Sequence, residues 1–266
     1  MLRRRLKIRI AVLASGSRGN AIYAETGGEA VLVDAGISRR QIERRLSSVG
    51  LSMGNVRTLL VSHEHDDHVK GLPGLMGRYP VSAFMSKGTL RALSGRLAEL
   101  KGGSRVETFR ANGSFQAGPW TVQAFPTPHD AEEPVGFILE AEGVRIGIAT
   151  DMGAATPEVV SALRGLHALV LEFNHDAEML ASGPYPAYVK ARIASPIGHL
   201  ANEEAGTLLR RVVHKGLRAV ILAHLSEVNN KPELARRAAD ESLGGHSTKF
   251  EVAGRMSPKV LRLFKR

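Results

Sequence analysis

The chain has 266 residues, of which 43% are hydrophobic, and it carries a formal net charge of +10 at pH 7. This length and apolar content fit a single α/β domain over residues 1–266 with a large buried core. Cysteine is absent, which excludes disulfides and thiolate ligands and leaves histidine and carboxylate for any metal site. The sequence contains neither an apolar run of roughly 20 residues nor a signal-peptide core, so we expect a cytoplasmic protein without a membrane partner.

Apolar periodicity predicts an alternation of strands and helices. The predicted strands are, in chain order, 8–13, 21–24, 30–33, 58–61, 81–85, 106–109, 120–125, 135–139, 144–149, 168–171, 219–223 and 250–252. The predicted helices are 38–49, 69–79, 87–100, 186–194, 203–213 and 234–243, and we expect Asp34 to cap the first and Asn202 the fifth. Two β-rich blocks, each followed by helices, indicate a four-layer αββα sandwich.

The excess of positive charge favours a polyanionic partner, because cations that neutralise phosphates release condensed counterions. The sequence has 36 lysines and arginines against 26 acidic residues. Most of these cations are arginines spread along the chain, a pattern that ordinary solvated helix faces also produce. Charge therefore admits nucleic acid as a partner without establishing it.

Two loops have the composition of phosphate-binding segments. Ser15–Asn20 is a Gly/Ser turn directly after the first predicted strand, and its backbone N–H groups and hydroxyls suit a phosphate. A plain tight turn explains the same residues equally well. Asn229-Asn230-Lys231, near the C-terminal helix, offers similar donors.

One segment, His63-Glu64-His65-Asp66-Asp67-His68, packs three histidines and three acids into six positions after an apolar run. Imidazole and carboxylate suit a divalent ion such as zinc or manganese. In an extended chain His63 and His65 point the same way, and Asp67 and His68 follow where a helix is expected to begin. The alternative is a polar loop that happens to be rich in histidine.

Polar residues recur just past other predicted strands. They are His129, Asp151, Glu172 and His224. Strand ends along one edge of a sheet lie near one another, so these side chains are able to converge on the histidine-rich segment. The histidines without such a position, which we assign to the surface or core, are His167, His214 and His246.

The histidine-rich segment resembles the HxHxDH signature of the metallo-β-lactamase superfamily. Asp34, His129, Asp151 and His224 follow the order of that superfamily's other motifs, so the resemblance extends from Ser15 to His224. Within the superfamily the chain is similar to the YycJ/WalJ (VicX) group of metallohydrolases. The segments that carry this likeness are 15–20, 171–176, 198–202, 224–226 and 229–230. The group is regarded as DNA-processing, with a 5′→3′ exonuclease activity linked to mismatch repair.

The resemblance implies two divalent metal ions, manganese or zinc with iron as a further option. It places His63, His65 and His129 on the first metal. The second would be held by Asp67, His68 and His224, with Asp151 bridging both. A hydroxide between the metals would be the nucleophile, oriented by Asp67. Glu64 and Asp66 are expected to act as spacers or supporting groups.

A proton donor for the departing sugar oxygen is assigned by likeness to the tRNA 3′-end-processing nucleases of the superfamily. His199 is the expected donor, with Glu172 orienting it and raising its pKa. The alternative is an exposed histidine in a loop and a surface acid. The residues expected to bind substrate are Ser15, Ser17, Asn20, Asn174, His175, Asn202 and Asn229.

The resemblance and the basic charge together indicate a dinuclear metal-dependent phosphodiesterase, expected to be a DNA 5′→3′ exonuclease acting in DNA repair. DNA is favoured over RNA partly because the sequence lacks an obvious β-CASP insertion. The main alternative is a hydrolase of the same fold that acts on a small phosphodiester, thioester or lactone. A binding or regulatory protein with a decayed site is disfavoured, since every expected ligand is present.

Overall fold

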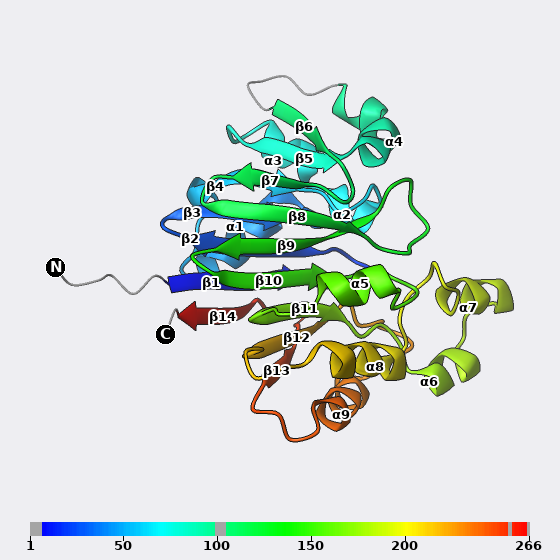
Figure 1. The fold of residues 1–266 in the computed structure, drawn as a ribbon. Helices are drawn as coiled ribbons and strands as arrows, with labels where there is room; N and C mark the ends of the chain where they lie inside the picture. The colour runs from blue at the N-terminus through cyan, green and yellow to red at the C-terminus, as the bar shows by residue number, and fades with distance from the viewer. Residues whose placement is uncertain (1–6, 99–104, 255–256, 265–266) are drawn as a thin grey trace.

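The structure is a computed structural model that describes residues 7–98, 105–254 and 257–264. Within these residues the chain forms two seven-stranded sheets that pack face to face, with helices on their outer faces (Figure 1). These four layers confirm the predicted αββα sandwich. None of the helices described is long and apolar enough to cross a membrane.

The first sheet has the strand order β14–β1–β2–β3–β4–β5–β6. Its strands are β1 (Lys7–Ala14), β2 (Ala21–Thr26), β3 (Glu29–Val33), β4 (Val56–Leu60), β5 (Ser82–Ser86), β6 (Arg105–Phe109) and β14 (Lys259–Phe264). Strands β14 to β3 pair antiparallel, and β3 to β6 pair parallel. The last strand of the chain therefore completes the sheet that the first strand begins.

The second sheet has the order β13–β12–β11–β10–β9–β8–β7. Its strands are β7 (Ser114–Ala117), β8 (Trp120–Pro126), β9 (Val135–Ala141), β10 (Val144–Ala149), β11 (Ala168–Glu172), β12 (Ala219–Ala223) and β13 (Lys249–Val252). Strands β7 to β10 pair antiparallel and β10 to β13 pair parallel.

Helices enclose both sheets from outside. Against the first sheet lie α1 (Arg39–Ser48), a 3-10 turn (Met53–Asn55), α2 (Asp66–Val69), α3 (Leu72–Met76) and α4 (Lys87–Leu97). The second half of the chain adds α5 (Pro157–Ala162), α6 (Ala177–Ser182), α7 (Ala187–Ile193), α8 (Asn202–Val212) and α9 (Pro232–Leu243). Of these, α5, α8 and α9 pack on the second sheet.

Both faces of the central strands are buried, which explains their continuous apolar sequences. In β1, for example, Ile10 and Val12 point into the layer between the sheets, while Ala11 and Leu13 pack against the helices outside. The sandwich therefore has one core between the sheets and one under each helical layer.

Several local predictions were wrong. The predicted helix 69–79 is two short helices, α2 and α3, which are separate because the chain turns at Gly71 before Pro73. Helix α4 ends at Leu97, and residues 99–100 of the predicted helix lie outside the described residues. The sequence reading missed β7, β14, α5 and α6.

The two predicted helix caps were also wrong. Ser38 caps α1 by accepting a hydrogen bond from the backbone N–H of Gln41, while Asp34 bonds elsewhere. Asn202 is the first residue of α8 rather than its cap, and its side chain pairs with Asn230. Both side chains are buried and serve tertiary contacts, which local sequence does not reveal.

Strand direction gathers the polar strand ends at one edge of the sandwich. Strands β1 and β3 run the same way, because β2 is antiparallel to both, and β4 is parallel to β3. Strands β8 and β10 run the same way for the same reason, and β11 and β12 are parallel to β10. The segments that follow these strands therefore lie together, as predicted for the site residues.

Candidate metal centre

Three side chains of the site lie on strained backbone at strand ends. Asp34, Asp151 and His224 have φ values of 61°, 58° and 54°, in the left-handed region that non-glycine residues rarely adopt. Asp34 and His224 directly follow β3 and β12, and Asp151 lies two residues after the end of β10. The turn that this conformation creates ends the strand and directs the side chain toward the space between the sheets. Such strain is typical of functional positions, where surrounding contacts hold the residue in place.

The histidine-rich segment and the loop after β8 form the first group of possible ligands. His63, His65 and His129 each offer one ring nitrogen, and these atoms lie within 4.8 Å of one another. The ring centroids of His63 and His65 are 4.6 Å apart, and that of His129 lies 5.1 Å from His63. This is the set predicted for the first metal.

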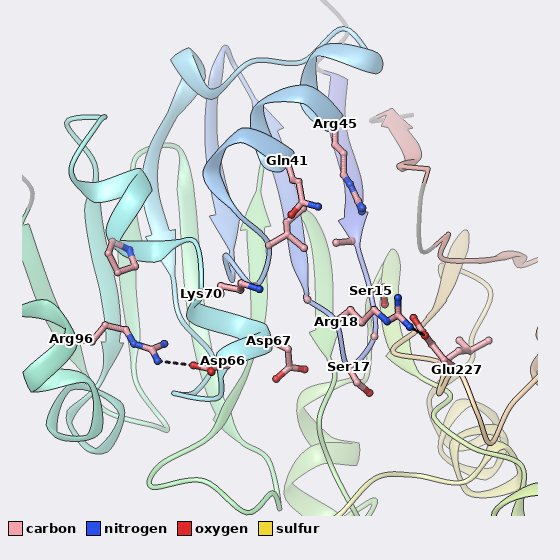
Figure 2. Close-up of a pocket in the computed structure, with 17 residues that line it drawn as sticks. Ser15, Ser17, Arg18, Gln41, Arg45, Asp66, Asp67, Lys70, Arg96 and Glu227 are labelled. Carbon is pink, nitrogen blue, oxygen red and sulfur yellow. Dashed lines mark hydrogen bonds and ion pairs between the residues drawn. The ribbon is translucent and has the colours of Figure 1, made fainter. Parts of the chain in front are cut away.

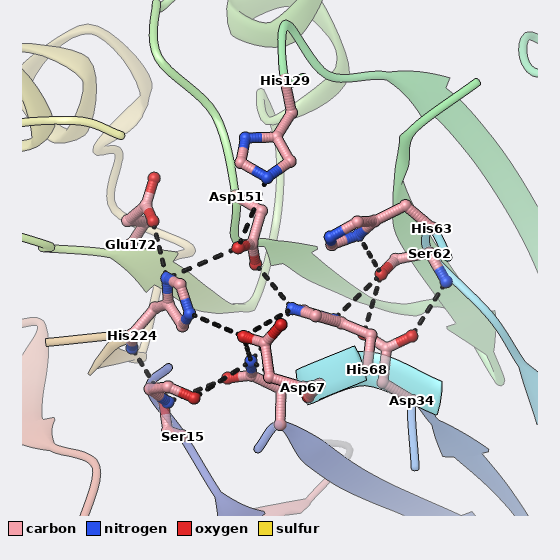
Figure 3. Close-up of polar contacts among 12 residues, drawn as sticks. Ser15, Asp34, Ser62, His63, Asp67, His68, His129, Asp151, Glu172 and His224 are labelled. Atoms are coloured by element: carbon pink, nitrogen blue, oxygen red, sulfur yellow. Dashed lines mark hydrogen bonds and ion pairs between the residues drawn. The ribbon is translucent and has the colours of Figure 1, made fainter. Parts of the chain in front are cut away.

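A second group lies beside the first and contains Asp67, His68, Asp151 and His224, again with ligand atoms within 4.8 Å. Figure 3 shows these four side chains facing one another. Asp151 Oδ2 lies 3.2 Å from His68 Nε2, and Asp151 Oδ1 lies 3.9 Å from His129 Nε2. Asp151 thus faces both groups, which is the position expected of a bridging carboxylate.

The histidines of the site are oriented by contacts on their Nδ1 atoms. His63 Nδ1 lies 3.0 Å from Ser62 Oγ, and His68 Nδ1 lies 2.8 Å from Asp34 Oδ2. His129 Nδ1 donates to the carbonyl oxygen of Gly198, at 3.0 Å. An imidazole held at Nδ1 presents Nε2 to the centre as a ligand, the usual arrangement in metal sites.

Three buried atoms at the centre have no hydrogen-bond partner among the described residues. They are His63 Nε2, Asp151 Oδ2 and His224 Nε2. Their side chains are almost fully buried, and a buried polar atom without a partner costs roughly 1–3 kcal/mol. A divalent cation satisfies imidazole nitrogen and carboxylate oxygen together, so the donor set fits the metal ions that the sequence predicts.

The charge distribution also favours a cation. Burial opposes a charge on His224, but the nearby carboxylates of Asp151, Asp67 and Glu172 raise the pKa of its imidazole to about 10. Burial likewise opposes ionisation of Asp151, yet His224 and His68 hold the pKa of its carboxyl well below the usual range. Burial together with His68 lowers the pKa of His63. The acids are therefore ionised and His63 is neutral near pH 7, whereas His68 and His224 carry protons that a bound metal ion would displace.

Asp34 and Ser62 contact ligand histidines without belonging to either ligand group. Asp34 accepts hydrogen bonds from the Ser62 backbone N–H at 2.8 Å and from the Ser62 hydroxyl at 2.9 Å, besides contacting His68. A carboxylate that holds a ligand histidine fixes its ring and increases its basicity. The sequence reading gave Ser62 no role, although its position directly before His63 was a usable signal.

Replacing Asp34 by alanine is therefore expected to weaken metal binding roughly 10- to 100-fold, because His68 loses the group that orients it. The measurement is competition with a chelator of known affinity. Asp66→Ala is the matched control, since Asp66 is an exposed neighbour whose carboxylate bonds Arg96. Equal metal affinity in both variants would contradict the supporting role of Asp34.

Glu172 and His199 are brought together beside the metal groups. Glu172 Oε1 lies 2.8 Å from His199 Nδ1 and 2.9 Å from His224 Nδ1. Burial opposes the charge on Glu172, but His199 and His224 hold the pKa of its carboxyl at about 2. Asp151, Glu172, His199 and His224 also have the spacing of a metal site. Because Glu172 already accepts hydrogen bonds from both histidines, we interpret them as a hydrogen-bond network.

Most residues expected to bind substrate lie below the surface. Asn174 donates to the carbonyl oxygen of His224 at 2.9 Å, and Asn202 pairs with Asn230. His175 and Asn229 are also buried. The contacts of Asn174 and Asn202 join the loops after β11 and β12. Because all four residues are buried, none of them is accessible to a substrate in this conformation. The side-chain amides of Asn174 and Asn202 instead hold the site loops in place.

Some residues of the Ser15–Asn20 loop hold neighbouring site residues in place, and others are exposed. Ser15 Oγ accepts a hydrogen bond from the backbone N–H of His224 at 2.6 Å, and Asn20 Nδ2 lies 3.3 Å from Asp67 Oδ2. Ser17 is exposed and lines the cavity around the ligands. A Cβ on Gly36 would lie 1.6 Å from the carbonyl oxygen of Asp67, so only glycine permits this close approach of the loops.

A cavity of about 220 Å³ gives access to the centre. Ligand residues form its floor, and α7 contributes Val189, Arg192 and Ile193 to its wall. Arg192 bonds Asp130 at 2.6 Å and so ties α7 to the loop that carries His129. The sequence reading did not identify α7 as part of the site, because no motif marks it.

Comparisons with known proteins agree with this geometry. A family described as "Beta-lactamase superfamily domain" matches residues 29–225. The chain is 34% identical over 236 residues to "Exodeoxyribonuclease YycJ" of Bacillus anthracis, and the match covers 89% of each chain. It is 30% identical over 226 residues to "Exodeoxyribonuclease WalJ" of Streptococcus pneumoniae, a match that covers 85% of this chain and 84% of the relative.

Solved structures show the same fold. The metallo-beta-lactamase fold protein YhfI from Bacillus subtilis superposes with a TM-score of 0.75 at 16% identity, covering 97% of this chain and 100% of that one. The family match covers most of the chain, and the ligand groups lie where the strands end. The chain therefore belongs to the metallo-β-lactamase superfamily and is a metal-dependent hydrolase.

Proposed function

We propose that the protein is a dinuclear phosphodiesterase that removes nucleotides from the 5′ end of DNA and acts in DNA repair. The observation that carries the proposal is the pair of ligand groups that meet at Asp151, with the Glu172–His199 pair beside them. Two metal positions and a separate proton donor are what cleavage of an unactivated phosphodiester requires. The exodeoxyribonuclease relatives and the net charge of +10 support DNA as the substrate.

In this proposal His63, His65 and His129 hold one metal ion. Asp67, His68 and His224 hold the other, and Asp151 contacts both. When bound, manganese, zinc or iron supplies a water of lowered pKa and positive charge for the phosphate oxygens. Asp67, whose carboxylate is partly exposed to the cavity, orients that water.

His199 gives a proton to the departing oxygen as the phosphorus–oxygen bond breaks. Its Nδ1 is held by Glu172, which leaves Nε2 as the nitrogen that donates. Fixing the ring in this way keeps the donor in the cavity shared with Asp67 and His129.

A hydrolase of a small phosphodiester, thioester or lactone is the alternative function. The observation in its favour is the limited volume of about 220 Å³ directly around the ligands. The proton donor and the basic charge favour a phosphodiester of nucleic acid over this alternative.

The test is incubation of the manganese-loaded protein with DNA and RNA labelled at the 5′ end and with a small chromogenic phosphodiester. We expect the 5′ label to be released from DNA as a mononucleotide and this activity to be lost on chelation. Cleavage confined to the small ester would favour the alternative function. Preferential cleavage of RNA would overturn the assignment to DNA.

A further inference from the structure

A second, larger cavity opens from the metal centre. Its volume is about 920 Å³, against about 220 Å³ for the cavity around the ligands. Ser17 and Asp67 line both cavities, which makes them two arms of one cleft. His199 lines only the smaller arm, and Lys70 lines only the larger one, which we call the Lys70 arm.

Four cations surround the Lys70 arm (Figure 2), and three of them are engaged within the protein. Arg96 pairs with Asp66 at 2.6 Å, and Arg18 pairs with Glu227 at 2.7 Å. Arg45 is buried and donates to the carbonyl oxygen of Leu13 at 2.6 Å. The remaining cation is Lys70.

Lys70 is exposed at the C-terminal end of α2, two positions after the ligand His68. Its ammonium makes no hydrogen bond or ion pair with any residue that the structure describes. Figure 2 places its side chain between α1 and the turn that carries Asp67. An ammonium without a partner beside a metal centre is available to a ligand that brings its own negative charge.

We propose that the Lys70 arm binds the backbone of the DNA strand that keeps the scissile phosphate, with Lys70 contacting a neighbouring phosphate. The inference rests on the proposed nuclease function. His199 protonates the leaving oxygen in the smaller arm, so the leaving nucleotide lies there and the retained strand extends through the other arm. The volume of about 920 Å³ lies within the range of roughly 300–1,000 Å³ that encloses ligands of nucleotide size.

The test compares Lys70→Ala with Lys215→Ala on single-stranded DNA. Lys215 is equally exposed but precedes β12, at the end of that strand opposite His224. For Lys70→Ala we expect the KM for DNA to rise roughly five- to tenfold. The slope of log kcat/KM against log salt should also fall in magnitude by roughly 0.7, the value for one lost phosphate contact on single strands.

Two further measurements decide the outcome. The loss in kcat/KM should be several-fold greater for DNA than for the small chromogenic phosphodiester, and Lys70→Arg should restore most of it. A Lys70→Ala variant that matches Lys215→Ala in KM and salt slope would overturn the inference while leaving the nuclease function in place. An equal loss on both substrates would overturn it too. If the wild type cleaves only the small ester, the proposed function itself fails.

Discussion

Replacing Asp67 by alanine is expected to lower kcat on DNA by roughly 10³-fold or more and to remove one of the two proposed metal ions. The Asp67 carboxylate lies 3.6 Å from both His68 Nε2 and His224 Nε2. It is also the more exposed of the two acids in the second ligand group, and it lines the cavity, so its loss should remove both a proposed ligand and the group proposed to orient the nucleophile. The measurements are single-turnover cleavage and metal content by atomic emission.

Glu64→Gln is the matched control, because Glu64 lies in the same segment but outside both ligand groups. Its Oε1 accepts a hydrogen bond from the backbone N–H of Glu132 at 2.7 Å, an interaction that glutamine retains. We expect near-normal kcat and metal content. An Asp67→Ala enzyme that binds its full metal complement and turns over normally would disprove the ligand assignment.

The second large effect is expected for His199→Ala, with kcat on DNA reduced roughly 10²-fold and metal content unchanged. The leaving group of the DNA substrate is a strongly basic sugar oxygen, which needs a proton as the phosphorus–oxygen bond breaks. The leaving group of a nitrophenyl phosphodiester is nitrophenolate, which is stable without a proton. Its cleavage should therefore be slowed much less by the loss of His199. This difference between substrates separates a proton donor from a structural residue.

His246→Ala is the control for His199→Ala, since His246 is exposed and lies outside every ligand group. Loss of metal from His199→Ala would instead assign His199 to the ligand network with Asp151 and His224. Equal losses on DNA and on the nitrophenyl ester would remove the proton-donor role.

The sequence alone determined the chemistry of the site. Spacing within 63–68 placed histidines and acids on a strand end and a helix start, where local geometry decides which way they point. Two β-rich blocks, each followed by helices, predicted the layered sandwich. The properties of such residues depend on residue type and on near neighbours in the sequence. A local pattern was therefore enough to find them.

The tertiary structure alone decided which distant groups meet. The role of Asp34 depends on His68, 34 positions away, and the Nδ1 of His129 is held by a carbonyl 69 positions away. The pairing of Glu172 with His199 spans 27 positions and was expected only from family resemblance. In the Lys70 arm, the Ser15–Asn20 loop and Asp67 had sequence signals, and Lys70 itself had none. Such contacts follow from strand order, direction and register, and a local pattern does not encode which strand ends become neighbours.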